Sequence, residues 1–209
     1  MPQSAQPFTR ARSDAQRQDR LSQLMAATRE CLTQTPAATL TLGDVAAAAG
    51  LAKSGILRYA GSREALLLRV MYGEHLSWID ALAVELRSAT PATALARTLA
   101  ARPVLCDLIA ASPVLISRLS PEDLRVLSTQ AGDAQQRLGA ALQPSLPLSD
   151  RRLGSLTAAV HAFTGTAWAW STPGSAGHDT IVTDFESTVR SLLEIFVAGL
   201  THGAPHGLA

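Results

Sequence analysis

One segment restricts the fold of this 209-residue chain more than any other: LTLGDVAAAAGLAKSGILRYAGSRE, residues 40–64. Thr41 precedes Asp44 at the spacing of a capping box, which marks the start of a helix. Gly50 follows the apolar run VAAAA, and glycine is the residue that most easily takes the left-handed conformation of a tight turn. We therefore expect a short helix that ends at Gly50 and a second short helix over 53–59. Two short helices joined by such a turn form a helix-turn-helix.

Helical periodicity extends through the rest of the chain, and no segment alternates polar and apolar residues as a strand does. A first amphipathic helix is predicted over 14–35, after a polar arm over 1–14 that we interpret as disordered. A long helix is predicted over 63–87. Prolines divide the remainder into predicted helices over 92–101, 103–111, 113–119, 121–143, 149–171 and 180–202, with a loop over 171–180. The predicted fold class is therefore all-α, in agreement with an aromatic content of only 4%.

The charge is divided unevenly along the chain. Residues 1–70 carry nine Lys and Arg against five Asp and Glu, a net charge of +4, whereas residues 71–209 carry nine against twelve, a net charge of −3. Lys53, inside the helix-turn-helix, is the only lysine among 18 basic residues. A basic N-terminal third that contains a helix-turn-helix favours binding to nucleic acid. The alternatives are a solvated charged surface and, for the single lysine, a chance survivor of a GC-rich codon bias.

Other function classes lack a sequence signal. The chain contains no GxSxG elbow, no HExxH zinc motif and no dinucleotide fingerprint, so we expect no enzyme, cofactor or metal site. His202 and His206 are close in sequence, but a glycine and a proline between them would break a shared helix. Cys31 and Cys106 lie in apolar helical patterns and are predicted to be two buried free thiols in a reducing compartment. Without a long apolar run or a signal peptide, we expect a cytoplasmic location and no membrane partner.

Residues 41–67 resemble the DNA-binding signature of the TetR (tetracycline-repressor) family of bacterial transcriptional regulators. The matching positions are Thr41, Val45-Ala46, Ala49-Gly50-Leu51, Lys53, Leu57-Arg58-Tyr59 and Ser62-Arg63-Glu64. The resemblance implies an N-terminal DNA-binding domain over 1–62 and a C-terminal ligand-binding and dimerisation domain over 63–209. It also implies that the helix over 53–59 enters the major groove of double-stranded DNA. The DNA-binding residues that it indicates are Thr41, Lys53, Ser54, Gly55, Arg58, Tyr59 and Arg63.

The signature departs from the family pattern at three positions. Ala52 replaces the serine that usually caps the recognition helix, a loss of about 1 kcal/mol unless another group caps it. Leu57 stands where a phosphate-contacting tyrosine is common, so Tyr59 is the tyrosine left to offer a hydroxyl to the phosphate. Ala60 stands where a core phenylalanine is usual, and a void there would cost about 3 kcal/mol or more. These departures put the stability of the DNA-binding domain in question.

The C-terminal part offers candidate ligand-binding and dimerisation surfaces. Trp78, Cys106, His161 and Trp168 are the candidate ligand contacts, although core or interface packing accounts equally well for the tryptophans. His161 on an apolar helix is more often a hydrogen-bonded core histidine than a ligand contact. The helices over 149–171 and 180–202 carry wide apolar faces, and we expect them to pair with their copies in a two-fold homodimer. Few charges accompany these surfaces, so the expected ligand is mostly apolar and cyclic or aromatic.

The sequence therefore predicts a homodimeric repressor that a small apolar ligand releases from an inverted-repeat operator. Three alternatives stay open. The protein could be a DNA-binding regulator without a small-molecule ligand. It could also be a helical ligand-binding protein with a degenerate DNA reader, or a helical module that binds protein through its helix-turn-helix.

Overall fold

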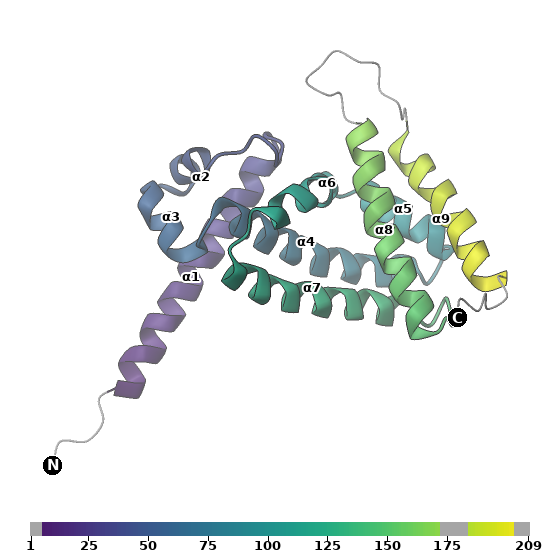
Figure 1. Ribbon diagram of the computed structural model, residues 1–209, viewed down its shortest axis with the longest axis horizontal. Coiled ribbons are helices and arrows are strands. Elements are labelled where there is room, and N and C mark those ends of the chain that lie inside the picture. Colours follow the sequence, from purple (N-terminus) through teal and green to yellow (C-terminus); the bar gives the residue numbers. More distant parts are fainter. Residues whose placement is uncertain (1–5, 172–183, 203–209) are drawn as a thin grey trace.

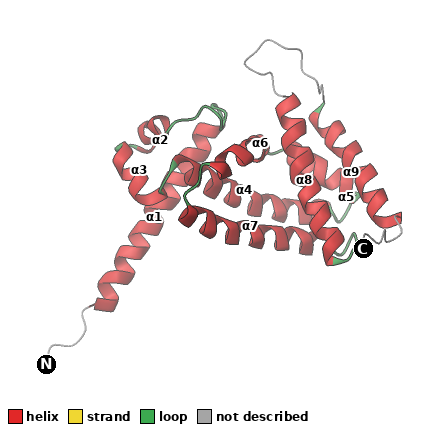
Figure 2. Cartoon of the chain, in the orientation of Figure 1, coloured by secondary structure: helices red, strands yellow, loops and turns green. Residues whose placement is uncertain are grey.

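The computed structural model describes residues 6–171 and 184–202, and over these residues the chain is all-α, without a strand (Figures 1 and 2). This confirms the predicted fold class. The predicted loop over 171–180 lies outside the described residues apart from its first residue. The helices in this part of the chain are α1 (Gln6–Leu32), α2 (Leu42–Ala49), α3 (Lys53–Ala60), α4 (Arg63–Glu85), α5 (Pro91–Ala100), α6 (Pro103–Ser117), α7 (Pro121–Leu142), α8 (Asp150–Ser171) and α9 (Phe185–His202).

The helix α1 begins at Gln6, so the interpretation of residues 6–13 as part of a disordered arm is wrong. That interpretation relied on the absence of apolar periodicity, which a helix does not need where it has no face to bury. The segment QPFTRARSDAQRQ contains alanine, glutamine and arginine, which favour helices, and no glycine. Its proline, Pro7, lies in the first turn, where the missing N–H interrupts no hydrogen bond. In Figure 1, α1 extends well beyond the body of the molecule.

The helix-turn-helix forms where the capping residues predict it. The hydroxyl of Thr41 accepts a hydrogen bond from the backbone N–H of Asp44 at 3.2 Å, and the Asp44 carboxylate accepts one from the N–H of Thr41 at 2.9 Å. This hydrogen bonding to Thr41 also lowers the pKa of Asp44. Gly50 takes a left-handed conformation with φ of 63° and ends α2. Ala52, the N-cap of α3, makes no side-chain hydrogen bond, as the sequence indicates.

The helix α6 runs through Pro113, so the prediction of two separate helices over 103–111 and 113–119 is wrong. Proline has no N–H to donate to the carbonyl four residues earlier, here that of Ile109. Ser112 supplies the missing donor, because its hydroxyl donates to the Ile109 carbonyl at 2.8 Å. The helix therefore tolerates the proline without leaving a carbonyl unpaired.

The apolar side chains form two cores, and α4 crosses from one to the other. The N-terminal core joins α1–α3 to the first turns of α4 and also includes Leu108 of α6 and Leu127 of α7. The C-terminal core surrounds Trp78, which is fully buried, and includes side chains of α5, α8 and α9. Figure 1 shows α1–α3 at one end of the molecule and α8 and α9 at the other. Because α4 contributes to both cores, as α6 and α7 also do, a displacement of α4 can reach both ends of the molecule.

The helices α5 and α6 pack into the interior through their leucine side chains. Leu95, Leu99, Leu105 and Leu108 are fully buried. No helix among the described residues has by itself the length and apolar composition needed to cross a membrane. The α5–α6 pair reaches them jointly, but it is bent by 95°.

Candidate nucleic-acid interface and ligand cavity

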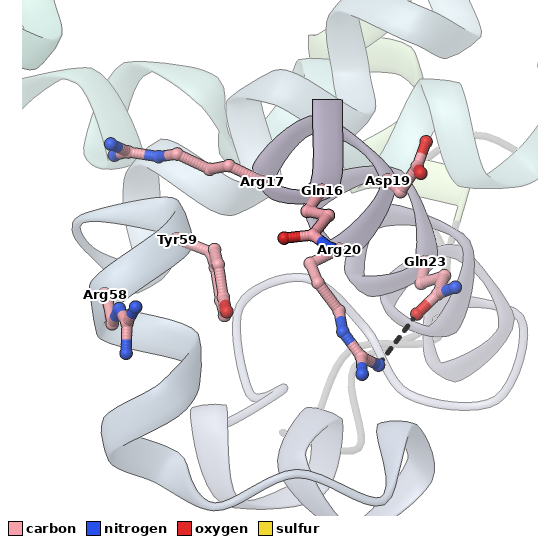
Figure 3. Close-up of a pocket in the computed structure, with 7 residues that line it drawn as sticks. All are labelled: Gln16, Arg17, Asp19, Arg20, Gln23, Arg58 and Tyr59. Carbon is pink, nitrogen blue, oxygen red and sulfur yellow. Dashed lines mark hydrogen bonds between the residues drawn. The ribbon is translucent and has the colours of Figure 1, made fainter. Parts of the chain in front are cut away.

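A basic groove of about 680 Å³ lies between the middle of α1 and the end of α3 (Figure 3). Its lining consists of Gln16, Arg17, Asp19, Arg20, Gln23, Arg58 and Tyr59. Arg20 donates a hydrogen bond to Gln23 at 3.1 Å, and the guanidinium of Arg58 lies 5.7 Å from the centre of the Tyr59 ring. In Figure 3 the carboxylate of Asp19 points away from Arg58 and Tyr59. The groove therefore presents guanidinium groups and a phenol hydroxyl, which are donors suited to phosphate.

The arginines of this groove differ from the other N-terminal arginines in their partners. Arg29, Arg63 and Arg69 form ion pairs with Glu74, Glu64 and Asp123. Among the described side chains, no ion pair involves Arg17, Arg20 or Arg58. Among the described arginine side chains of residues 16–69, those that no carboxylate neutralises thus lie between α1 and α3.

The residues predicted on the recognition helix lie on α3. Lys53 is the first residue of this helix, and Ser54 and Arg58 are exposed. Leu57 is also exposed, at 45% of its surface, so it presents an apolar group beside these polar ones. Gly55 borders open space, because a Cβ added there would have no neighbour within 4 Å.

Two of the predicted DNA contacts have their side chains engaged within the protein. The guanidinium of Arg63 donates to the carbonyls of Ala37 and Leu40 and pairs with Glu64 at 3.4 Å. All three of its nitrogens are therefore engaged: two hold the segment between α1 and α2 against α4, and the third pairs with Glu64 on α4 itself. We assign Arg63 a positioning role instead. The hydroxyl of Thr41 is exposed but takes part in the capping box of α2.

Arg17 and Arg20 are groove residues that the sequence reasoning missed. The only local signal is their spacing, since residues three apart lie on the same face of a helix. That signal becomes meaningful only when the tertiary structure places this face beside α3.

A second hollow, of about 390 Å³, lies between α4, α6, α7 and α8. This is at the low end of the range of about 300–1,000 Å³ that small-molecule sites span. The lining, which is mostly apolar, consists of Leu68, Met71, Tyr72, His75, Ser112, Ile116, Leu119, Leu124, Leu127, Ser128, Gln130, Ala131, Ala134, Gln135, Ala158 and His161. We refer to this hollow as the ligand cavity.

Two histidines meet in the wall of the ligand cavity. Nδ1 of His75 lies 3.5 Å from Nε2 of His161, and the two ring centres are 4.8 Å apart. The other face of His75 contacts Trp78 edge-on, at 5.2 Å between ring centres. Burial, assisted by the neighbouring His161, lowers the pKa of His75 to about 3, and burial also lowers the pKa of His161. Both rings are therefore neutral at pH 7.

Only one of the four predicted ligand contacts, His161, lines the ligand cavity. Trp78 is fully buried and donates its ring N–H to Thr98 at 2.9 Å. Cys106 is buried in the C-terminal core, where burial raises the pKa of its thiol to about 12. Trp168 packs on the same core and contacts Phe185 edge-on. Trp78, Cys106 and Trp168 therefore do not line this cavity: the first two are buried in the C-terminal core, and Trp168 is partly buried against it.

Polar contacts connect the helices of the ligand cavity to the helix-turn-helix. Asp123, in the first turn of α7, lies 3.8 Å from the guanidinium of Arg69. Arg69 in turn donates to the carbonyl of Ala60, the last residue of α3, at 2.7 Å. On the other side, Glu74, next to His75, pairs with Arg29 of α1 at 2.6 Å. A movement of α4 or α7 can therefore reach both α1 and α3.

Comparison with known proteins identifies the family. Residues 24–70 match the family described as "Bacterial regulatory proteins, tetR family", and residues 69–204 match "Tetracyclin repressor-like, C-terminal domain". A comparison with curated proteins gave no match.

Solved structures share the fold at low sequence identity. A TetR transcriptional regulator from Rhodococcus sp. RHA1 is similar at 18% identity and a TM-score of 0.58, over 90% of this chain and 100% of that one. The fatty acid degradation regulator FadR from Bacillus halodurans is similar at 14% identity and a TM-score of 0.57, over 86% and 98%. FadR from Bacillus subtilis, solved in complex with stearoyl-CoA, is similar at 14% identity and a TM-score of 0.56, over 85% and 98%. Because the two family matches together cover most of its length, the chain belongs to the TetR family of bacterial transcriptional regulators.

Proposed function

We propose that the protein is a homodimeric cytoplasmic repressor that binds an inverted-repeat operator and is released by a small, mostly apolar ligand. In this proposal α3 enters the major groove with Lys53, Ser54, Gly55 and Arg58, while Arg17, Arg20 and Tyr59 bind the phosphates beside it. The ligand occupies the cavity between α4, α6, α7 and α8.

One observation carries the proposal: α4 belongs to both functional parts. Its first turns complete the core beneath the helix-turn-helix, and its middle supplies Leu68, Met71, Tyr72 and His75 to the ligand cavity. A ligand that displaces α4 therefore changes the position of α3. Release of DNA requires that the ligand bind the displaced arrangement more tightly than the DNA-bound one. The stearoyl-CoA complex of the Bacillus subtilis relative supports a small-molecule ligand for a regulator of this fold; the acyl chain of that ligand is apolar, although its coenzyme A part is charged.

The dimer is proposed from the apolar surface of α8 and α9. Leu192 is exposed at 37%, Ile195 at 73% and Trp170 at 46% of their surfaces. Phe163 and Phe196, which contact each other edge-on at 5.8 Å, are only partly buried. Exposed apolar side chains on both helices favour pairing with a second copy through residues 149–171 and 180–202.

The test is a titration of DNA that flanks the gene for this protein, followed by gel shift or fluorescence anisotropy. Binding that depends on phosphate contacts falls steeply between about 50 and 200 mM salt.

We expect Lys53→Ala and Arg58→Ala each to weaken operator binding by roughly 1 to 3 kcal/mol. Arg17→Ala should weaken specific and nonspecific DNA alike and reduce the salt slope by about one charge. Arg118→Ala, which removes an exposed arginine at the end of α6, is the matched control. Normal binding by all three groove and helix variants would exclude this interface.

A specific observation favours the second candidate, a helical ligand-binding or protein-binding module with a degenerate DNA reader. Ala52 leaves the N-terminus of α3 without a side-chain cap. The same titration separates the two functions, because contact with a protein need not depend on salt in this way. A protein that binds ligand but no DNA at low salt would support the second candidate.

A further inference from the structure

We propose that the ligand of the cavity is a neutral, mostly apolar molecule that carries a hydroxyl group, and that this hydroxyl donates a hydrogen bond to Nε2 of His75. The inference rests on the proposed function, in that it takes the cavity to be a small-molecule site. It adds the chemical class of the molecule and the residue that recognises it.

The hydrogen bonds through the two histidines determine which nitrogen of His75 is free. Nδ1 of His161 lies 2.8 Å from the carbonyl oxygen of Thr157, and because a carbonyl only accepts, this nitrogen carries the proton. Nε2 of the neutral His161 ring is then an acceptor, and it faces Nδ1 of His75 at 3.5 Å. Nδ1 of His75 is therefore the donor in this long contact. Nε2 of His75 remains as an unprotonated acceptor.

This acceptor is buried and unsatisfied. His75 is only 5% exposed, and its Nε2 has no hydrogen-bond partner among the described residues. A buried polar atom without a partner costs free energy, which a donor from a bound molecule recovers. Because His75 lines the cavity, a ligand there is the group placed to supply that donor.

In the rest of the cavity wall, too, the hydroxyl donors are used within the protein and an acceptor is left free. The lining hydroxyl groups donate to protein acceptors: Ser112 to the Ile109 carbonyl at 2.8 Å, Ser128 to the Leu124 carbonyl at 2.6 Å and Tyr72 to the Asp133 carboxylate at 2.7 Å. Gln135 donates to the hydroxyl of Thr157 at 2.8 Å. Apart from His75, the wall atom that is buried without a partner among the described residues is Oε1 of Gln130, which is also an acceptor. The wall thus favours a ligand that donates hydrogen bonds.

The charges around the cavity exclude strongly ionised ligands. None of the lining residues carries a formal charge at pH 7. A carboxylate or phosphate would lose its hydration and meet two unpaired acceptors with no cation. A ligand cation would find Asp133, the carboxylate bonded to the lining residue Tyr72, already paired with Arg137 at 3.0 Å. A neutral phenol or alcohol avoids both costs.

The test compares three probe series by isothermal titration calorimetry on the DNA-free protein: 4-alkylphenols, their methyl ethers and the corresponding 4-alkylbenzoates. Each series spans ethyl to hexyl chains, so that the cavity can select a length. A phenol donates to His75, whereas its methyl ether cannot and a benzoate is an anion. We expect the best phenol to bind about tenfold tighter than its ether, the size of one net hydrogen bond, and the benzoate to bind more weakly still.

The variants assign that preference to one nitrogen. In His75→Phe the ratio of phenol to ether affinity should fall to about one, because ring volume is kept and the acceptor is lost. Met71→Leu, a change in the same wall without a polar group, should keep the wild-type ratio even where absolute affinity changes. In ¹⁵N-histidine spectra, the Nε2 resonance of His75 should move upfield with the phenol and stay with the ether. Because this spectrum is recorded on the wild-type protein, it tests the proposal even if a variant fails to fold.

Several results would overturn the proposal: ethers or benzoates that bind as tightly as phenols, an unchanged ratio in His75→Phe, or no binding by any phenol in the series. None of these results bears on operator binding by the ligand-free protein. Conversely, a phenol that binds through His75 but leaves DNA bound would support the ligand class and overturn the proposed release. The two failures are therefore distinguishable.

Discussion

Gly55 is the residue on α3 whose presence the protein's own packing does not explain. A Cβ there would meet nothing within 4 Å, and glycine inside a helix is destabilising relative to alanine. Under the proposed function, we expect a close approach of α3 to the DNA backbone to require this glycine.

We therefore predict that Gly55→Ala raises the free energy of unfolding by about 0.5 to 1 kcal/mol and at the same time weakens operator binding. The added methyl group stabilises α3 but stands between this helix and DNA. Thermal unfolding and anisotropy titration measure the two effects. Gly132→Ala is the matched control, because Gly132 also lies within a helix beside open space, but on α7. It should stabilise the protein and leave DNA affinity unchanged. Wild-type DNA affinity in Gly55→Ala would refute the close approach.

The burial of His75 in its neutral form predicts how the stability of the protein depends on pH. Its pKa is about 3 in the folded protein and 6.5 in the unfolded chain, so between these values the unfolded state binds more protons. Stability is therefore complete above pH 6.5 and is lost as the pH falls towards 3, at up to about 1.4 kcal/mol per pH unit for this one group. His161, whose pKa is also lowered, adds in the same direction.

The measurement is urea unfolding of the wild type and His75→Phe between about pH 7 and pH 4.5. We expect the free energy of unfolding of the variant to fall less steeply over this range, because the group that must stay neutral is gone. Met71→Leu should retain the wild-type slope. Parallel slopes for the wild type and His75→Phe would show that His75 is not held neutral.

At the scale of elements, α7 is tied to the helix-turn-helix at the turn between α3 and α4. Asp123 lies against this turn, 3.4 Å from the position that a Cβ on Gly61 would occupy, and it pairs with Arg69. Because Arg69 also bonds the end of α3, we expect the pair to transmit a displacement of α7 to α3.

We predict that Asp123→Asn leaves the affinity of the ligand cavity nearly unchanged but weakens the coupling between ligand and DNA by about 0.5 to 1 kcal/mol. More ligand would then be needed to release the same fraction of DNA. Operator anisotropy at increasing 4-alkylphenol concentration measures the coupling, and calorimetry measures the binding. Glu122→Gln removes the same charge at the adjacent exposed position and should leave both unchanged. Equal coupling in Asp123→Asn and the wild type would exclude this route.

At the scale of the whole molecule, Leu193 and Ile195 of α9 allow folding to be tested separately from association. Leu193 is fully buried in the C-terminal core, so an aspartate there would place a charge in the interior and unfold the protein. Ile195 is 73% exposed on the same helix, so the folded monomer tolerates a charge at this position.

We predict that Ile195→Asp keeps the helical content of the wild type but shifts the protein from dimer to monomer in sedimentation. Operator affinity should fall with it, because an inverted repeat needs two linked α3 helices. Val126→Asp is the control, since Val126 is 44% exposed on α7, one turn after Asp123 and near the helix-turn-helix. It should stay dimeric. An Ile195→Asp protein that sediments as the wild type would mean that α9 does not form the interface.

Local signals in the sequence were sufficient to predict the helices and the helix-turn-helix. The capping box at Thr41, the left-handed turn at Gly50 and the uncapped Ala52 all depend on groups within a few residues of one another. Such interactions form wherever the local sequence is present, so they can be predicted without the fold. The exceptions are also local: the start of α1 at Gln6 and the passage of α6 through Pro113 depend on compensations that apolar periodicity does not register.

The composition of the two sites was decided only by the tertiary structure. The groove brings Arg17 beside Arg58, and the ligand cavity brings His75 beside His161, although each pair is far apart in sequence. Trp78 and Cys106 have the same helical, apolar surroundings in the sequence as His161, yet they face the core and not the cavity. Which face of a helix borders a cavity depends on how neighbouring helices cross it, and these crossings are set by side chains contributed from the whole chain.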